Sequence, residues 1–279
     1  MRFNPVIVAI IISGFTSCGE SAGTSSKTAT KEQDSIPTLQ EPAPQTKAEM
    51  KSAAAITETK QVPVLCYHSI RDQIKSDKVY TVTIPEFASH LKMLKDSGYN
   101  TILPQQYLDY LAYGTALPEK PVMLSFDDTR VEHYTIAGKQ MEQYGFRGAF
   151  FIMNIAIGKP NYMSAEQIKL LSDSGHTIGS HTWDHQNAKN IHGDDWKIQL
   201  DEPKAKLESI TGKPVEFFAY PFGVWTDSAA YQVKNRGIKA AFILTQKRST
   251  AEPLYTIRRM IVPSGWNGAK LKRFMDQSF

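Results

Sequence analysis

Eight short apolar runs, spread over residues 62 to 262, limit more than any other feature how this chain can fold. They are rich in Val, Ile and Phe and show little alternation, which is typical of strands buried on both faces of a parallel sheet. Amphipathic stretches separate them, so strands and helices are expected to alternate. The pattern predicts a closed or nearly closed (β/α) barrel, with an open doubly wound sheet as the alternative. The runs are Val62–Tyr67, Asn100–Leu103, Val122–Phe126, Ala149–Met153, Thr177–Ser180, Phe217–Tyr220, Ala240–Leu244 and Tyr255–Val262.

Signals between the apolar runs mark where helices begin and end. Thr83 and Glu86 can form a capping box, as can Ser164 and Gln167, and each pair opens an amphipathic stretch. Pro203 lies inside a later amphipathic stretch, so we expect that helix to be kinked or split. Several strands are preceded by a glycine that can end a helix in the left-handed conformation. These glycines are Gly98, Gly145, Gly175, Gly212 and Gly237.

The N-terminus has the pattern of an export signal. Arg2 is followed by an apolar stretch at 6–12 and then by small polar residues, and that stretch is too short for a permanent membrane span. The segment Phe15–Cys18 resembles the lipoprotein box of bacteria, although Phe15 stands where leucine is preferred. We therefore predict a lipid anchor at Cys18 and a place in the bacterial cell envelope, on the periplasmic side or the outer surface. Ordinary secretion with an incidental cysteine is the alternative.

The predicted domain organisation is simple. Residues 1–17 form the signal peptide, and 18–60 form a disordered tether because they are polar and nearly free of aromatic residues. Residues 61–279 form the single folded domain, which we expect to act as a monomer. A net charge of +4 without any dense basic cluster argues against nucleic-acid binding. Cys66, in an apolar run, is expected to be a buried core residue.

Residues able to do chemistry gather where the predicted strands end. His68, the pair Asp127 and Asp128, and the pair His181 and His185 each follow an apolar run at its carboxyl end. Functional groups of parallel α/β folds collect at this edge, so one rim is expected to hold an active site.

The two histidines are four residues apart, which places both imidazoles on one face if a helical turn begins there. A carboxylate from another strand would complete a set of two histidines and one carboxylate, which suits catalytic zinc and also non-heme iron, and the pair Asp127 and Asp128 favours this interpretation. Two solvated histidines, and an aspartate that caps a helix, are the simpler interpretations.

Three segments resemble the successive motifs of the polysaccharide deacetylases of carbohydrate esterase family 4, the NodB-homology group. They are Ser125–Asp128, His181–His185 and Tyr220–Gly223, and the similarity extends over nearly all of residues 63 to 262. The resemblance implies a deformed (β/α) barrel related to the TIM barrel. It also implies a divalent metal, usually zinc, with cobalt or nickel as alternatives.

Roles follow from the resemblance residue by residue. Asp127 would be the general base, while Asp128, His181 and His185 would hold the metal. His68, near the start of the domain, resembles the acid histidine of a circularly permuted branch that contains deacetylases of poly-β-1,6-N-acetylglucosamine.

Two positions depart from the family pattern. Ala219 stands where the family has an arginine that orients the base, and we take Arg259 as its substitute. Thr129 stands where a glycine often follows the aspartate pair.

The implied reaction is removal of N-acetyl groups from an amino-sugar polysaccharide. The backbone N–H of Phe222 would help to stabilise the oxyanion, and Tyr220, Trp225 and Trp183 are candidates for contact with sugar rings.

The remaining histidines are weaker candidates for a role in the reaction. We expect His176 to be a core residue and His133 to line the rim. His90 and His192 are expected at the surface.

Other functions remain open from the sequence. The enzyme could deacylate peptidoglycan, chitin oligomers or O-acetylated glycans, and an iron oxygenase is a more distant possibility. A carbohydrate-binding lipoprotein without catalysis is the alternative from another class.

Overall fold

The structure is a computed structural model that describes residues 49–74, 76–244 and 247–279. These residues belong to one compact unit. Within them, no helix combines the length and apolar character that a membrane span requires. The predicted signal peptide, the lipidation site Cys18 and most of the predicted tether lie outside the described residues.

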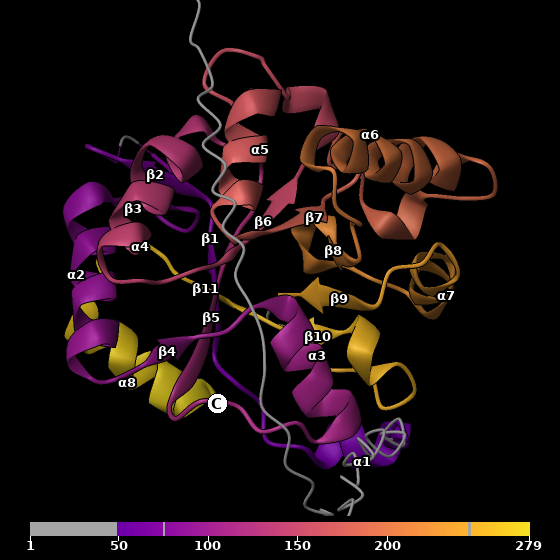
Figure 1. The fold of residues 1–279 in the computed structure, drawn as a ribbon, viewed down its shortest axis with the longest axis horizontal. Coiled ribbons are helices and arrows are strands. Elements are labelled where there is room, and N and C mark those ends of the chain that lie inside the picture. The colour runs from indigo at the N-terminus through magenta and orange to yellow at the C-terminus, as the bar shows by residue number, and fades with distance from the viewer. Residues whose placement is uncertain (1–48, 75, 245–246) are drawn as a thin grey trace, which may run out of the picture. The chain divides into compact units, whose positions relative to one another are not determined.

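Parallel strands form the centre of the fold (Figure 1). Each of the eight apolar runs overlaps at least one of them, and on β5 and β6 alternate residues pack into different apolar clusters. On β5, for example, Met123 belongs to one cluster and Leu124 to the other. The strands of the main sheet are β1 (Val64–Tyr67), β4 (Asn100–Thr101), β5 (Pro121–Phe126), β6 (Ala149–Ile152), β7 (Thr177–Ser180), β8 (Phe217–Ala219), β9 (Ala240–Ile243), β10 (Ile257–Arg258) and β11 (Met260–Ile261).

The sheet closes through a single short segment of chain. Ile257 and Arg258 of β10 pair with β9, whereas Met260 and Ile261 of β11 pair with β1 on the other side. The order β10-β9-β8-β7-β6-β5-β1-β11 therefore returns to the same stretch of residues. This confirms the nearly closed barrel and excludes the open doubly wound sheet. Arg259 lies where the pairing changes from one neighbour to the other.

Helices surround this barrel and begin where the sequence signals predict (Figure 1). Thr83 and Ser164 each cap a helix through a complete capping box, and Gly212 ends one with a φ of +69°. The helix that contains Pro203 is split, because a π-helical turn at Lys197–Asp201 precedes it. The helices are α1 (Ala53–Glu58), α2 (Ile84–Asp96), α3 (Pro104–Tyr113), α4 (Lys139–Gln143), α5 (Ala165–Asp173), α6 (Glu202–Thr211), α7 (Asp227–Asn235) and α8 (Gly268–Ser278).

Two features near the N-terminus of the domain differ from the prediction. The tether was expected to extend to residue 60, but α1 is helical and its Ile56 is buried against the core. Ser52 caps this alanine-rich turn, and the Ile56 carbonyl accepts a hydrogen bond from Arg248. In addition, β2 (Ser69–Arg71) and β3 (Thr81–Thr83) form a small parallel sheet beside the barrel.

Candidate active site

Asp128, His181 and His185 converge at the carboxyl ends of β5 and β7. Asp128 Oδ1 lies 3.6 Å from His181 Nε2 and 3.4 Å from His185 Nε2. This buried oxygen accepts no hydrogen bond from the described residues. A buried carboxylate oxygen without a donor, facing two imidazole nitrogens, fits the ligand set of a divalent metal. The three side chains form one of the groups in the described chain that could hold an ion.

A backbone carbonyl fixes the orientation of His181. The Nδ1–H of His181 donates a hydrogen bond to the Ala219 carbonyl oxygen at 2.7 Å, which leaves the Nε2 lone pair facing Asp128. His181 is fully buried, and burial lowers its pKa to about 4. The imidazole is therefore neutral near pH 7, as a metal ligand must be. Ala219 thus contributes to the site through its main chain.

The backbone of the rim adopts an unusual conformation. Seven residues other than glycine have positive φ in the described ranges, and five of them lie here: Asp128, Thr129, Thr182, His185 and Phe222. Residues in this region are strained and persist only where the surroundings impose it, which is typical of functional sites. The histidine pair therefore meets through a tight turn and not through the helical turn that the four-residue spacing would allow.

Thr129 shows how this chain manages without the usual glycine. Its φ of +61° is a conformation that β-branched residues rarely adopt. The Thr129 hydroxyl accepts a hydrogen bond from the Met153 N–H at 2.7 Å and donates one to the Met153 carbonyl at 3.2 Å. These two bonds connect the strained turn to the end of β6 and offset part of its strain.

Asp127 points into the barrel and pairs with Arg259. The two carboxylate oxygens accept hydrogen bonds from Nη1 and Nη2 of the guanidinium, both at 2.7 Å. Burial opposes ionisation of Asp127, but Arg259 and the neighbouring imidazoles outweigh it and hold the pKa of this carboxyl well below its usual range. Arg259 therefore contacts Asp127 directly, and its substitution for the missing motif arginine stays a prediction.

His68 lies beside the same carboxylate. Its Nε2 is 4.0 Å from Asp127 Oδ2, and the imidazole is almost buried. Tyr80 packs edge-on against the ring at 4.8 Å between centroids, while the His133 side chain hydrogen-bonds the His68 carbonyl oxygen. Burial lowers the pKa of His68, and the two aspartates act against that change.

The aromatic candidates at the rim differ in their exposure. Phe222 is 57% exposed and Trp183 is 38% exposed, so both can contact a ligand, and Trp225 is half-buried. The Phe222 ring packs against His185 at 4.5 Å. Tyr220 was expected near substrate, but its side chain is fully buried beside Phe218, so its ring cannot stack on a sugar at the surface.

Some residues have contacts that the sequence did not indicate. Tyr80 and Cys66 touch His68, and His133, which was expected only to line the rim, is fully buried beneath it. His90 is also buried and bonds the Trp266 carbonyl, so its expected surface position is wrong. His176 lies in the core, as predicted, and accepts a hydrogen bond from Gly148.

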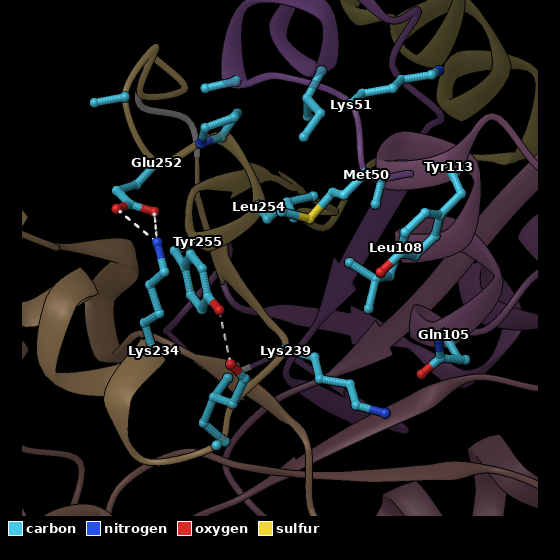
Figure 2. Close-up of a pocket in the computed structure, with 17 residues that line it drawn as sticks. Met50, Lys51, Gln105, Leu108, Tyr113, Lys234, Lys239, Glu252, Leu254 and Tyr255 are labelled. Atoms are coloured by element: carbon cyan, nitrogen blue, oxygen red, sulfur yellow. Dashed lines mark hydrogen bonds and ion pairs between the residues drawn. The ribbon is translucent and has the colours of Figure 1, made fainter. Parts of the chain in front are cut away.

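A cavity of about 440 Å³ lies away from this rim (Figure 2). Its walls include Ile238 and Lys239, which precede β9, so it lies near the amino end of that strand. Lys234 pairs with Glu252 there at 3.2 Å, and the Tyr255 hydroxyl bonds the Ile238 carbonyl. None of the predicted site residues lines this cavity.

Comparison with known proteins shows similarity to polysaccharide deacetylases. A family model described as polysaccharide deacetylase matches residues 114–241. YxkH of Bacillus subtilis, which carries a polysaccharide deacetylase name, is 24% identical over 77% of this chain and 76% of its own length. The poly-beta-1,6-N-acetyl-D-glucosamine N-deacetylase of Staphylococcus epidermidis is 25% identical over 73% of this chain and 75% of its own. A deacetylase of Streptococcus pyogenes, solved with acetate, shares the fold with a TM-score of 0.72 at 20% identity, over 77% of this chain and 98% of that one.

Proposed function

We propose that the chain, which matches the polysaccharide deacetylase model over residues 114–241, removes N-acetyl groups from an amino-sugar polysaccharide by metal-assisted hydrolysis. The observation that carries the proposal is the convergence of Asp128, His181 and His185 next to the buried pair of Asp127 and Arg259. The relative from Staphylococcus epidermidis favours a β-1,6-linked polymer of N-acetylglucosamine as substrate. Peptidoglycan, chitin oligomers and O-acetylated glycans are the alternative substrates.

Asp128, His181 and His185 would hold the metal, most simply zinc. When bound, a divalent zinc polarises the acetyl carbonyl and lowers the pKa of water to about 7. The ligand set also suits iron, so metal replacement belongs in the test.

The protein's own residues supply the proton transfers. Asp127 is ionised and lies close to the imidazoles of His68 and His181, so it can take the proton from the attacking water. Arg259 keeps its carboxylate in a fixed orientation. His68, on the other side of Asp127 Oδ2, would protonate the departing amine, which is otherwise a poor leaving group. Exposed Phe222 would offer its N–H to the oxyanion, while Trp183 and Trp225 would contact the sugar.

The first test is acetate release from a panel of N-acetylated and O-acetylated glycans by the full chain. We expect release from the N-acetylated polymer, its loss after removal of metal by a chelator, and its recovery with zinc, cobalt or nickel. The variant His185→Ala should bind less metal and lose at least about 100-fold in kcat, because an open site with two ligands holds zinc poorly.

His192→Ala provides the control, because His192 is an exposed histidine that is not among the predicted ligands. It should keep both metal and activity. Activity of the metal-free protein would refute the metal role. Glycan binding without acetate release would favour the non-catalytic carbohydrate-binding protein, and iron with oxygen-dependent turnover would favour the oxygenase.

We also propose that the protein is an exported lipoprotein of the cell envelope, anchored through Cys18. The motif Phe15–Cys18 and the apolar stretch before it support this proposal. Cys18→Ala should release the protein from the membrane fraction and prevent incorporation of labelled fatty acid. Cys66→Ala leaves the motif unchanged and should keep both. Membrane retention with unchanged labelling in Cys18→Ala would contradict the anchor.

A further inference from the structure

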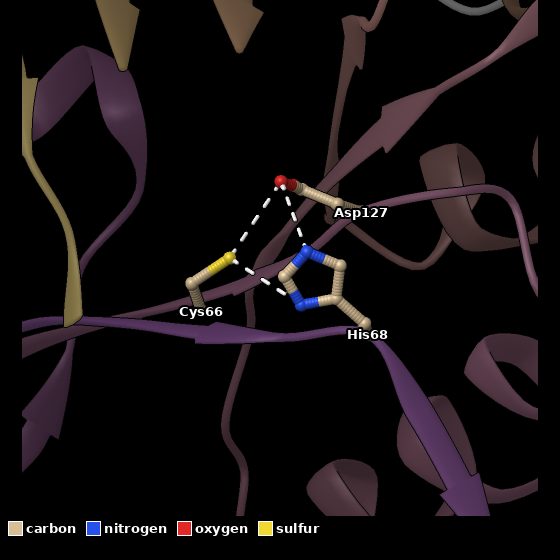
Figure 3. Close-up of side chains that lie close together, drawn as sticks. All are labelled: Cys66, His68 and Asp127. Carbon is tan, nitrogen blue, oxygen red and sulfur yellow. Dashed lines mark hydrogen bonds and ion pairs between the residues drawn. The ribbon is translucent and has the colours of Figure 1, made fainter. Parts of the chain in front are cut away.

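The thiol of Cys66 lies beside two side chains of the candidate site and is not enclosed by apolar groups alone. Its thiol Sγ lies 3.6 Å from Asp127 Oδ2 and 4.0 Å from His68 Nδ1 (Figure 3). The residue is fully buried and forms no disulfide. It therefore touches both groups to which the proposed reaction assigns a proton transfer.

The alternation of β1 explains why this side chain faces the site. Leu65 and Tyr67 point into one apolar cluster, so Cys66 between them points to the opposite face. Cys66 pairs with Ser125 of β5 on one side and with Ile261 of β11 on the other. The thiol thus projects from the strand that lies between the Asp127 strand and the Arg259 segment.

The contacts of Asp127 Oδ2 define what the thiol can do. This oxygen accepts a hydrogen bond from Arg259 Nη2 at 2.7 Å and lies 4.0 Å from His68 and 3.9 Å from His181. The Cys66 thiol donates the second hydrogen bond to it. Burial raises the pKa of Cys66 well above its ordinary value, so the sulfur keeps the proton that it donates.

We infer that Cys66 is a positioning residue for the reaction, which holds Asp127 Oδ2 and the His68 ring in their relative places. The inference rests on the proposed deacetylase function. Arg259 fixes the carboxylate from one side, and the thiol contacts the same oxygen and the imidazole from another. This position suits a small side chain that can donate a hydrogen bond to Asp127, whereas a larger apolar side chain would clash with the His68 ring.

A second metal site is the competing interpretation, because Cys66, His68 and Asp127 have the side chains of metal ligands. The charge distribution argues against it. Both oxygens of Asp127 are already occupied by the Arg259 guanidinium, and a cation placed here would lie next to that positive charge. The thiol is therefore a donor in this cluster.

The test compares Cys66→Ala and Cys66→Ser with Val64→Ala, all in the full chain loaded with zinc. Val64 is buried two residues earlier on the same strand, pairs with Met123 and packs in an apolar cluster, so it controls for loss of packing. Cys66→Ala should lower kcat about tenfold without change in KM or metal content, as expected when one hydrogen bond is lost. Cys66→Ser should recover part of kcat, because its hydroxyl can donate. Val64→Ala should lose stability and keep kcat.

Wild-type kcat in Cys66→Ala, or an equal loss in Val64→Ala, would overturn the inference. Zinc bound beyond one equivalent by the wild type and not by Cys66→Ala would establish the second metal site instead.

An infrared measurement tests the contact without activity. In a Cys18→Ser background the S–H stretching band belongs to Cys66 alone, since the chain has two cysteines. The band should move in Asp127→Asn, because an amide accepts a weaker hydrogen bond than a carboxylate. An unmoved band would overturn the inference, whereas a wild type that releases no acetate would overturn the proposed function and leave this readout intact.

Discussion

Arg259→Leu is expected to destabilise the folded protein by about 3–5 kcal/mol, because it leaves the Asp127 carboxylate buried without its charged partner. Both residues are 1% exposed, so water cannot replace the lost hydrogen bonds. The variant should also lose most of its activity, since an unpaired buried carboxylate takes up a proton or turns away. Urea denaturation measures the first effect and acetate release measures the second.

Two further variants separate charge from geometry. Arg259→Lys keeps the positive charge but cannot contact both oxygens, so it should recover some stability and little activity. The double variant Arg259→Leu with Asp127→Asn removes both charges and should be more stable than Arg259→Leu alone. If the stability losses of Arg259→Leu and Asp127→Asn, each measured alone, simply added up in the double variant, a direct interaction between the two side chains would be contradicted.

The same pair predicts a dependence of stability on acid. The pKa of Asp127 is lower in the folded protein than its ordinary value of 3.8, so ionised Asp127 stabilises the fold above that pH. This contribution is lost as the pH falls through the folded pKa. With a chelator present to exclude metal release, the wild type should therefore lose more stability between about pH 5 and pH 2 than Asp127→Asn does.

The barrel and the convergence of the candidate residues at its rim could be predicted because both depend on local regularities. Apolar runs without alternation mark strands buried on both faces, and their carboxyl ends share one edge. Asp128, His181 and His185 follow directly from that rule. The capping boxes that begin with Thr83 and Ser164 were also reliable, because each is complete within four residues.

Contacts between distant residues were harder to predict. The proposal that Arg259 replaces the motif arginine came from a family resemblance, but its physical basis is the register of the barrel. Arg259 lies where pairing changes from β9 to β1, so its side chain enters the interior next to Asp127. Cys66 could not be told from an ordinary core residue, because the sequence does not reveal which side chains contact the inner face of β1. Tyr80 precedes a short strand with no apolar periodicity, and nothing in the sequence places it against His68.

The separate roles that we propose for Asp127 and His68 give the sharpest expected result. Asp127→Asn and His68→Ala should each reduce deacetylation of the glycan at least about 100-fold. Asparagine has the shape of aspartate but cannot take a proton from water. Alanine at position 68 removes the group next to Asp127 Oδ2 that can protonate an amine. Metal content and the folded fraction, measured for each variant, must match the wild type before the rates are compared.

A substrate whose leaving group needs no proton distinguishes base from acid. An aryl acetate releases a phenolate, so its hydrolysis requires activation of water but not protonation of the leaving group. His68→Ala should therefore keep most of its aryl acetate activity, whereas Asp127→Asn should lose activity on both substrates. If His68→Ala and Asp127→Asn each lost the same factor in rate on the glycan and on the aryl acetate, His68 would not be the acid. Full activity of Asp127→Asn on either substrate would contradict its role as the base, because no other carboxylate contacts His68 and Arg259 together in the described part of the chain.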